Sequence, residues 1–438
     1  MLFLRFVRTN CPQAADLRGW ILFLLGIFFL PSSVLIGGIL LFFALIFGSF
    51  KPFLAFKKDK FNYFFLFTAL LMIVGSIRSY SGWLAWIGLA NWLPMFWAFW
   101  GFQAYLTTSI ARRIVAIFLL FGTIPVVFTG LGQMWFGFQG PWEIFNGLII
   151  WHIAIGGEPY GRLSGLFDYA NIAGTWLAVV WPFSLAALSQ KPQISLRNFI
   201  FFAFAVFIAI SIALTDSRNA WGGLLLAVPW VFGPFTWKWL LPLLFIFLLP
   251  IIFAVLPWAP SQLQLFSRQL VPDSLWTRLN DMQYEGRSLQ STRLNQWRVA
   301  FKLISERPLL GWGAAAFSVL YPLRAGLWHG HAHNLPIELA VSNGLLVSIL
   351  ITFATLYLLI RTFRIIIYPL KSKSSQQQSI SIFDRAWWSS SLILVFMHGT
   401  DIPLFDSRIN IIGWILLSGL RVISFSESKN LLTSKVNN

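Results

Sequence analysis

The residues best suited to chemistry lie in one short histidine-rich segment. Trp328-His329-Gly330-His331-Ala332-His333-Asn334 holds three of the five histidines of the chain. In an extended segment, spacing of two residues puts all three imidazoles on one face, which permits a metal site, although the segment has no Cys, Asp or Glu to complete a ligand shell. The alternative is that these histidines are ordinary polar residues at the start of a helix. We favour His333 as a general base, because imidazole accepts a proton near neutral pH.

A second polar segment, Thr215 to Trp221, separates two apolar runs. Its Asp216 and Arg218 can neutralise one another at a tight turn. The competing interpretation is a ligand site, because an arginine at a membrane boundary is costly to desolvate and is often kept for a ligand. Together with Arg293, Arg218 could flank a diphosphate, since guanidinium is a planar donor suited to bidentate phosphate contact.

The sequence around Arg293 predicts an amphipathic helix that stops at Arg307-Pro308. Leu294, Trp297, Phe301 and Ile304 follow the spacing of one helical stripe. Arg293 falls inside this stripe, whereas Arg298 falls on the opposite half of the helix. We therefore expect Arg293 to point with the apolar face.

Two more polar segments accompany these. Around Arg162, which is a third phosphate candidate, Gly161 and Gly165 could allow close backbone approach, and Asn171 lies near an expected helix start. The segment from Met397 to Arg408 is either a plain polar hairpin or the source of an aspartate, Asp401 or Asp406, that orients a catalytic base. No residue one helical turn after His333 can orient its imidazole. The residue that orients His333 must therefore come from elsewhere in the fold.

The composition sets the class of protein that must position these residues. Of 438 residues, 57% are hydrophobic and 11% are charged, against roughly 25% charged in a soluble domain. The net charge of +17 is scattered over short connectors, which favours anionic lipid and phosphate over nucleic acid as partners. The single cysteine, Cys11, cannot form an internal disulfide. A P-loop and an Asp-x-Asp metal pair are both missing, so we expect no cofactor and no metal.

The apolar runs are continuous rather than alternating, which predicts an all-α polytopic membrane fold. We expect about twelve spans, several of them shorter than the ~20 residues that cross a bilayer. The first run is a helical hairpin interrupted at Pro31-Ser32-Ser33. The runs fall near 19–50, 62–77, 83–105, 114–130, 171–189, 198–214, 219–232, 239–256, 334–360, 388–399 and 410–424.

Charge predicts the orientation of these spans. Nearly all lysines fall on one side if the N-terminus is cytoplasmic, and the other side is rich in arginine. Long connectors at about 131–170 and 257–333 lie on the arginine-rich side, and long loops in a compact domain are usually functional. We divide the chain into N-terminal helices with the first long connector (1–160), a region that holds the polar segments described above and the connector at about 257–333 (161–424), and a cytoplasmic tail (425–438).

Taken together, these segments resemble the O-antigen ligase and polymerase superfamily of bacterial membrane glycosyltransferases. The ligase pattern of His, Asn, nine residues and Gly is met by His333, Asn334 and Gly344, but Val347 stands where Gly, Thr or Tyr is usual. The motifs that carry the resemblance are Gly161 to Asn171, Ser217 to Trp221, Arg293 to Trp297, Glu306 to Gly313 and His331 to Asn334.

The resemblance implies an inverting, metal-independent transfer of a glycan from undecaprenyl diphosphate to an acceptor sugar, commonly the lipid A core. The reaction would take place at the periplasmic face of the bacterial inner membrane, in lipopolysaccharide or surface polysaccharide assembly. Arg218 and Arg293 would hold the diphosphate, and His333 would activate the acceptor hydroxyl. Further candidates for substrate binding are Arg162, Arg298, His331 and Asn334.

Three alternatives remain open at this point. An O-antigen polymerase differs only in using another lipid-linked repeat as acceptor. The stretch from His398 to Arg421 resembles a branch labelled as inorganic-carbon transporters, which could bind bicarbonate. Transport should show charged residues in mid-span and interrupted helices at matched positions in two halves, and the sequence indicates neither. A purely structural membrane scaffold is the third.

Overall fold

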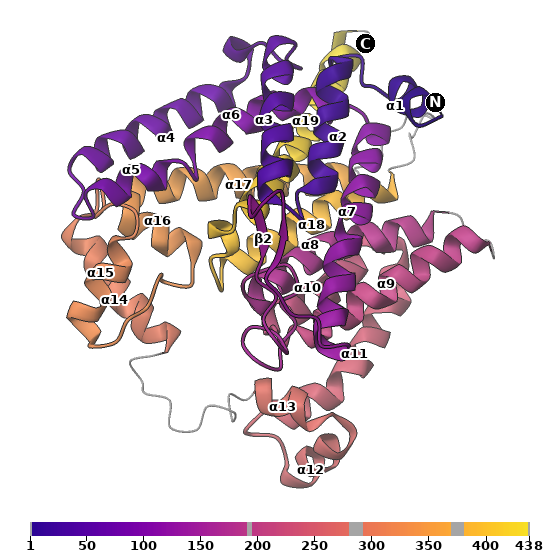
Figure 1. The fold of residues 1–438 in the computed structure, drawn as a ribbon, viewed down its shortest axis with the longest axis vertical. Helices are drawn as coiled ribbons and strands as arrows, with labels where there is room; N and C mark the ends of the chain where they lie inside the picture. The colour runs from indigo at the N-terminus through magenta and orange to yellow at the C-terminus, as the bar shows by residue number, and fades with distance from the viewer. Residues whose placement is uncertain (1, 191–194, 280–291, 369–380, 437–438) are drawn as a thin grey trace.

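The protein is all-helical, with 74% of its residues in helices, as a computed structural model shows. The structure describes residues 2–190, 195–279, 292–368 and 381–436, so part of the 257–333 connector and the last two residues of the expected tail lie outside the described residues. Figure 1 shows the helices of these described residues and the short two-stranded sheet that accompanies them. The α-helices are α1 (Leu2–Thr9), α2 (Leu17–Phe29), α3 (Val34–Phe50), α4 (Lys60–Ile77), α5 (Trp83–Leu89), α6 (Leu93–Gly101), α7 (Ser109–Trp135), α8 (Ala170–Ser189), α9 (Leu196–Leu214), α10 (Arg218–Phe232), α11 (Trp237–Val255), α12 (Ser261–Leu270), α13 (Asp273–Leu279), α14 (Arg293–Glu306), α15 (Ala316–Ala325), α16 (Leu335–Asn343), α17 (Leu345–Ile366), α18 (Ile382–His398) and α19 (Ser407–Val436). Short 3-10 helices are η1 (Phe56–Lys58), η2 (Phe102–Tyr105), η3 (Pro234–Thr236) and η6 (Pro403–Phe405), and the strands are β1 (Trp142–Ile144) and β2 (Ile149–Trp151).

Seven helices among the described residues are long and apolar enough to cross a membrane. They are α4, α7, α8, α9, α11 with η3, α17 and the first part of α19, and α2 and α3 are shorter apolar helices. The expected total of about twelve spans therefore stays a prediction.

Two of the predicted spans are broken in the structure. The run 334–360 divides into α16 and α17 at Gly344, whose φ of +89° is strained for other residues. A side chain at Gly344 would also collide with the carbonyl of Leu309. The run 83–105 divides into α5, α6 and η2. The single continuous helices expected at these two places were wrong.

The N-terminal helical hairpin is confirmed. Ser33 ends the break between α2 and α3, and its hydroxyl accepts a hydrogen bond from the Ile36 N–H as the N-cap. Glycines let the two helices pack closely, since a side chain at Gly37 would meet the backbone of Leu30. The hydroxyl of Tyr105 donates to the Ala44 carbonyl at 2.6 Å and ties α3 to η2.

Helix α8 forms the centre of the main bundle. It packs against α7, α9, α10 and α18, and Trp176 and Phe183 of α8 are fully buried. At one end of this bundle, charged side chains are buried as pairs. Arg112 binds both carboxylate oxygens of Asp384, at 2.7 and 2.9 Å, and Arg421 and Asp59 pair at 2.7 Å. The polar segments singled out in the sequence gather elsewhere, around the start of α8 and the end of α18.

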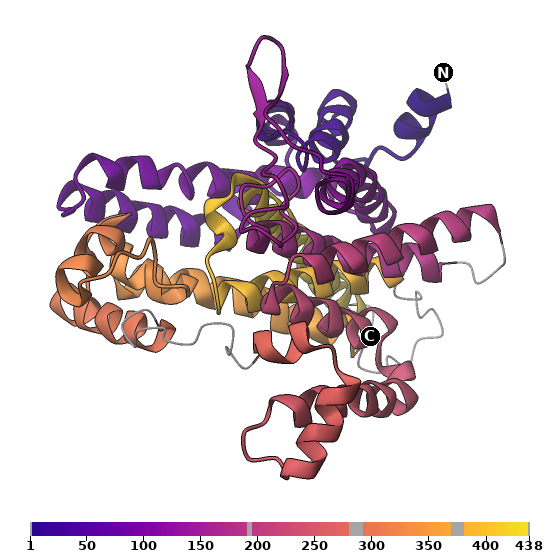
Figure 2. The same ribbon diagram turned by 60° about the horizontal axis from the view of Figure 1, so that its bottom comes forward.

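Helices α14, α15 and α16 form an outer lobe, seen beside α4 and α5 in Figures 1 and 2. This lobe has its own hydrophobic core, separate from that of the bundle. The core residues are Val299, Ala300, Leu303, Ala316, Phe317, Leu320, Tyr321, Ala332 and Val341. Figure 2 also shows the β1–β2 hairpin projecting from the helices.

The predicted helix α14 exists and ends before Arg307, but the expected packing face was wrong. Leu294 and Phe301 are 74% and 57% exposed. The buried face carries Gln296, Val299, Ala300 and Leu303 instead. The small side chain of Ala300 allows close packing in the lobe, so the shape of the partner surface, rather than the larger apolar stripe, decides which side is buried.

Candidate functional site

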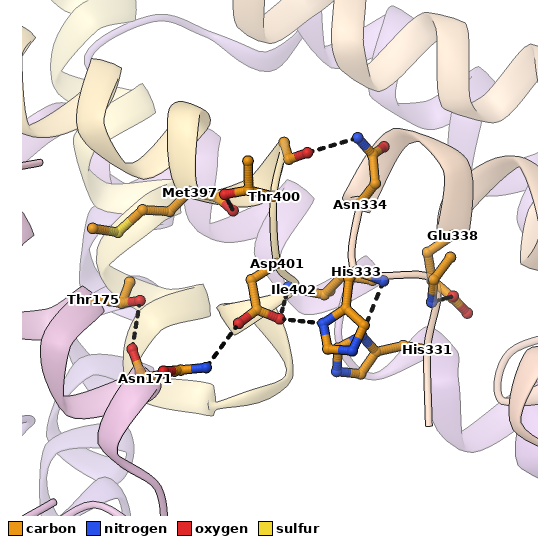
Figure 3. Close-up of polar contacts among 12 residues, drawn as sticks. Asn171, Thr175, His331, His333, Asn334, Glu338, Met397, Thr400, Asp401 and Ile402 are labelled. Atoms are coloured by element: carbon orange, nitrogen blue, oxygen red, sulfur yellow. Dashed lines mark hydrogen bonds and ion pairs between the residues drawn. The ribbon is translucent and has the colours of Figure 1, made fainter. Parts of the chain in front are cut away.

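His333 lies where the outer lobe meets the bundle, and its imidazole is held by an aspartate from the end of α18. Its Nδ1 atom is 3.0 Å from Oδ1 of Asp401, and the dashed line between the two side chains in Figure 3 marks this contact. The two side chains are 28% and 15% exposed. Burial acts to raise the pKa of Asp401, but the hydrogen bond and charge of His333, with smaller help from His331 and the Ile402 N–H, outweigh it and lower that pKa to about 2. Asp401 is therefore an ionised partner for an imidazole N–H.

Asp401 also begins a chain of polar contacts that runs into the bundle. Asn171, in the first turn of α8, lies with its Nδ2 3.4 Å from Oδ2 of Asp401. Arg162 donates from Nη2 to Oδ1 of Asn171 at 2.6 Å and from Nε to the Thr215 carbonyl at 2.9 Å. Three of the polar segments of the sequence are thus joined to His333. Since Arg162 is buried and bonded to the scaffold, its contacts favour a structural role over a phosphate contact.

Two neighbours of His333 are also engaged. Asn334 is the N-cap of α16: its Oδ1 accepts the Ile337 N–H, and its Nδ2 donates to the Gly399 carbonyl at 2.8 Å. Nδ1 of His331 accepts the N–H of His333 at 3.2 Å. Burial, and then the charge of His333, lower the pKa of His331 to about 4, with a smaller contribution from Arg293. His331 is therefore a neutral hydrogen-bond acceptor at neutral pH.

The arginines predicted to hold a diphosphate start two different helices. Arg293 is the first residue of α14, and its charge acts on His331. Arg218 is the first residue of α10, and its Nη1 reaches the Arg278 carbonyl at 3.5 Å. Asp216 forms an ion pair with Arg278 at 3.1 Å. The sequence did not single out Arg278 as a partner of this segment.

The remaining predicted positions lie apart from this cluster of contacts. Asp406 pairs with Arg408 at 2.6 Å, so of the two candidate aspartates it is Asp401 that contacts His333. Arg298 is exposed on α14.

Glu338 was not predicted, although it is buried beside the histidine segment and binds the N–H of Ala332 at 2.9 Å. Its position one turn inside α16 is the only signal that the sequence carries.

His331, His333 and Asp401 could together hold a metal ion. Each offers one ligand atom, and these atoms lie within 4.8 Å of one another. The absence of a carboxylate in the histidine segment was a reason against a metal, and the fold supplies one from a distant segment. Nδ1 atoms of both histidines, however, already have protein partners. The donor set thus fits either a metal centre or a metal-free base with its orienting carboxylate.

A cavity of about 280 Å³ adjoins the site between α16, α17, α18 and α19. Its wall is mostly apolar and includes Leu339, Ile351 and Trp414, and it reaches Gly399, which binds Asn334. Two buried atoms of wall residues, Nε2 of His398 and Oδ1 of Asn410, have no hydrogen-bond partner within the described part of the chain. The cavity therefore offers a mostly apolar surface to a bound molecule.

Comparison with known proteins identifies the domain that contains most of this site. The family model described as O-antigen ligase matches residues 203–352, which include Arg218, Arg293 and His333. No curated protein matches the chain significantly. The match and the apolar helices together support a multi-pass membrane glycosyltransferase of the O-antigen ligase or polymerase type. Residues 203–352 are thus similar to the O-antigen ligase family, which supports the resemblance seen in the sequence motifs.

Proposed function

We propose that the protein is an inverting, metal-independent glycosyltransferase that moves a glycan from undecaprenyl diphosphate to a hydroxyl of an acceptor glycan, with the lipid A core as the leading acceptor. The observation that carries the proposal is the contact between His333 and the ionised Asp401. An ionised, half-buried carboxylate on Nδ1 favours one tautomer of the imidazole, in which Nδ1 carries the proton and Nε2 can accept another.

The reaction follows from this tautomer. Nε2 of His333 takes the proton of the acceptor hydroxyl as its oxygen attacks the anomeric carbon of the donor sugar. The bond from this carbon to the diphosphate oxygen breaks, and the diphosphate leaves with the electron pair. Attack opposite the leaving group inverts the anomeric centre. Asp401 stabilises the imidazolium that forms, as a carboxylate does in other histidine-based sites.

Arg218 and Arg293 are proposed to stabilise the diphosphate. Negative charge grows on the leaving group as the sugar bond breaks, and guanidinium groups already in place stabilise it strongly where water is scarce. The effect of Arg293 on His331 supports its placement near the reacting atoms. A chain of contacts also supports placement of the Arg218 segment near the reacting atoms. It runs from Asp401 through Asn171 and Arg162 to Thr215.

The cavity beside Gly399 supports a lipid-linked donor. An isoprenoid chain is apolar, and the cavity wall beneath the polar site is mostly apolar as well. The diphosphate at the head of such a lipid would then lie close to His333. We place this site at the periplasmic face of the inner membrane, since the lysine-rich connectors lie on the opposite side of the predicted topology.

A deletion strain tests the proposal and separates the two acceptor types. Gel analysis of surface glycans should show no capped lipid A core in the absence of a ligase, whereas loss of a polymerase leaves a single capped repeat. Wild-type protein and His152→Ala, which changes an exposed histidine outside the site, should restore the long chains, and His333→Ala should not. Restoration by His333→Ala at normal membrane levels would overturn the proposal.

A further inference from the structure

The backbone N–H and the carbonyl of Ala332, just before His333, are each held by a side chain from a different helix. Oε2 of Glu338 on α16 accepts the Ala332 N–H at 2.9 Å. The indole N–H of Trp297 on α14 donates to the Ala332 carbonyl, also at 2.9 Å. Ala332 itself is fully buried in the lobe core. Both polar groups of this residue's backbone are therefore fixed.

The backbone conformation of His333 explains why the hydrogen bonds to Ala332 are needed. Its φ is +50°, in the left-handed region that residues with a side chain rarely adopt. Such a conformation persists only where the surroundings determine it, and strained residues cluster at active sites. Here Ala332 is fixed before the strained residue, and Asn334 after it is fixed by Gly399 and by Ile337. Releasing either side would let His333 relax away from Asp401.

Trp297 also links the histidine to the predicted diphosphate site. It lies one helical turn after Arg293 on α14. Movement of α14 would therefore shift Arg293 and the Ala332 carbonyl together. Glu338 performs the matching task from α16, whose N-cap is Asn334.

Burial of the Glu338 carboxyl group costs free energy. It is 5% exposed, and burial raises its pKa to about 7 despite the hydrogen bonds from Ala332 and Ser342 and the charge of His333. Buried carboxyl groups are retained where their hydrogen bonds matter, because an apolar residue of similar size would cost less. Its hydroxyl partner Ser342 lies on the same helix at 3.1 Å, so the bond to Ala332 is the one that reaches another segment.

We propose that Glu338 and Trp297 are positioning residues that hold the backbone N–H and carbonyl of Ala332 between them and so set the imidazole of His333 against Asp401. This inference rests on the proposed glycosyl transfer for its kinetic consequence. Its structural part concerns only the histidine segment and can be tested without any substrate.

The test compares Glu338→Ala, Glu338→Gln and Trp297→Phe in the full-length protein in proteoliposomes. Glutamine keeps an acceptor for the Ala332 N–H, whereas alanine removes it. Phenylalanine keeps an aromatic ring at position 297 but is smaller than the indole and has no N–H to donate, so Trp258→Phe controls for the change of ring. Glu306→Gln and Trp258→Phe are the matched controls, because Glu306 is an exposed residue paired with Arg324, and Trp258 is 74% exposed.

The first measurement is hydrogen–deuterium exchange of the peptide that contains Ala332 and His333. We expect fast exchange in Glu338→Ala and Trp297→Phe, and slow exchange in Glu338→Gln, in both controls and in the wild type. Slow exchange in Glu338→Ala would overturn the proposal even if glycan transfer were established.

The second measurement is the rate of transfer, with the lipid-linked glycan pool of the native membranes as donor. Misplacing a catalytic group should lower kcat by about 10- to 100-fold in Glu338→Ala, and by about 2- to 10-fold in Trp297→Phe, the loss expected for one hydrogen bond. KM for the donor should change little, and Glu338→Gln should recover most of kcat. Equal losses in Glu338→Ala and Glu338→Gln, or a loss expressed only in KM, would contradict a positioning role. Altered exchange with no transfer in the wild type would refute the proposed function alone.

Discussion

The ion pairs of the bundle and the one at the junction with the outer lobe differ in where their two partners come from. At one end of the bundle, Arg112 with Asp384 and Arg421 with Asp59 are pairs whose partners both belong to the bundle. Where the lobe meets the bundle, the pair is divided: His333 comes from the lobe side and Asp401 from the end of α18. A pair that lies within one region can form without the other region, whereas a divided pair is complete only when the two regions are correctly docked. We infer that docking of the lobe is what assembles the site.

The divided pair predicts the largest effect. Asp401→Asn keeps the shape of the side chain but removes its charge and lets it present an N–H to the imidazole. The wrong tautomer would then leave Nε2 protonated, and transfer should fall by about 10³- to 10⁴-fold, as in other histidine-based sites. The measurement is initial rate in proteoliposomes. Asp406→Asn, which alters the neighbouring pair with Arg408, should lose far less, and equal losses would remove the distinction between the two aspartates.

A core change in the lobe should break one region and spare the other. Leu303→Ala removes a fully buried side chain from the lobe core and should destabilise the lobe by about 2–5 kcal/mol. Exchange protection should fall in α14 and α15 and persist in α8. Leu309→Ala, at a position 76% exposed, is the control. Equal loss of protection in α8 would mean that the two cores unfold as one unit.

The buried Glu338 gives the lobe a pH dependence. Because burial raises its pKa from 4.5 to about 7, the folded state holds this proton more tightly than the unfolded state. Its contribution to stability is complete below pH 4.5 and is lost as pH rises through 7, a change on the order of 3 kcal/mol. The measurement is the thermal unfolding of the wild type and of Glu338→Gln as a function of pH. The difference between the two proteins isolates the contribution of Glu338 to stability from that of His331, whose lowered pKa changes stability with pH in the opposite direction. A difference that grows as pH falls below 4.5 would contradict this assignment.

The smallest expected effect is that of a chelator. If His331, His333 and Asp401 act as an acceptor, a base and an orienting carboxylate, EDTA should leave the transfer rate unchanged. Loss of activity with EDTA that is restored by Zn²⁺ would assign the same three residues to a metal centre instead. Metal content of the purified protein provides the independent check.

The elements that follow from local sequence were predictable. Helices α8 and α9 match their predicted runs closely, because each is a single apolar stretch bounded by polar residues. The break at Gly344 was not predicted, although Asn343-Gly344 within the run is a typical signal for the end of a helix. The face of α14 that packs in the lobe was not predictable from its own apolar stripe, because the packing partners come from α15 and α16.

The site was predictable as a set of segments but not as a geometry. Residue types marked the histidine, arginine and aspartate segments, yet His333 and Asp401 are 68 residues apart in the chain. A local signal favoured Asp401 over Asp406, because Arg408 lies two residues after Asp406 and neutralises it. Glu338 gave no such signal, because its partner is a backbone N–H.

The most direct test of the central claim measures glycan transfer by purified protein after one substitution at a time on each side of the junction. Arg293→Ala and His333→Ala change the lobe side, and Arg218→Ala changes the bundle; His152→Ala and Arg324→Ala are controls at exposed positions. We predict that each of the first three loses at least about 10²-fold in rate while both controls keep wild-type rates. Wild-type transfer by Arg293→Ala or by His333→Ala would contradict a site built jointly by the lobe and the bundle.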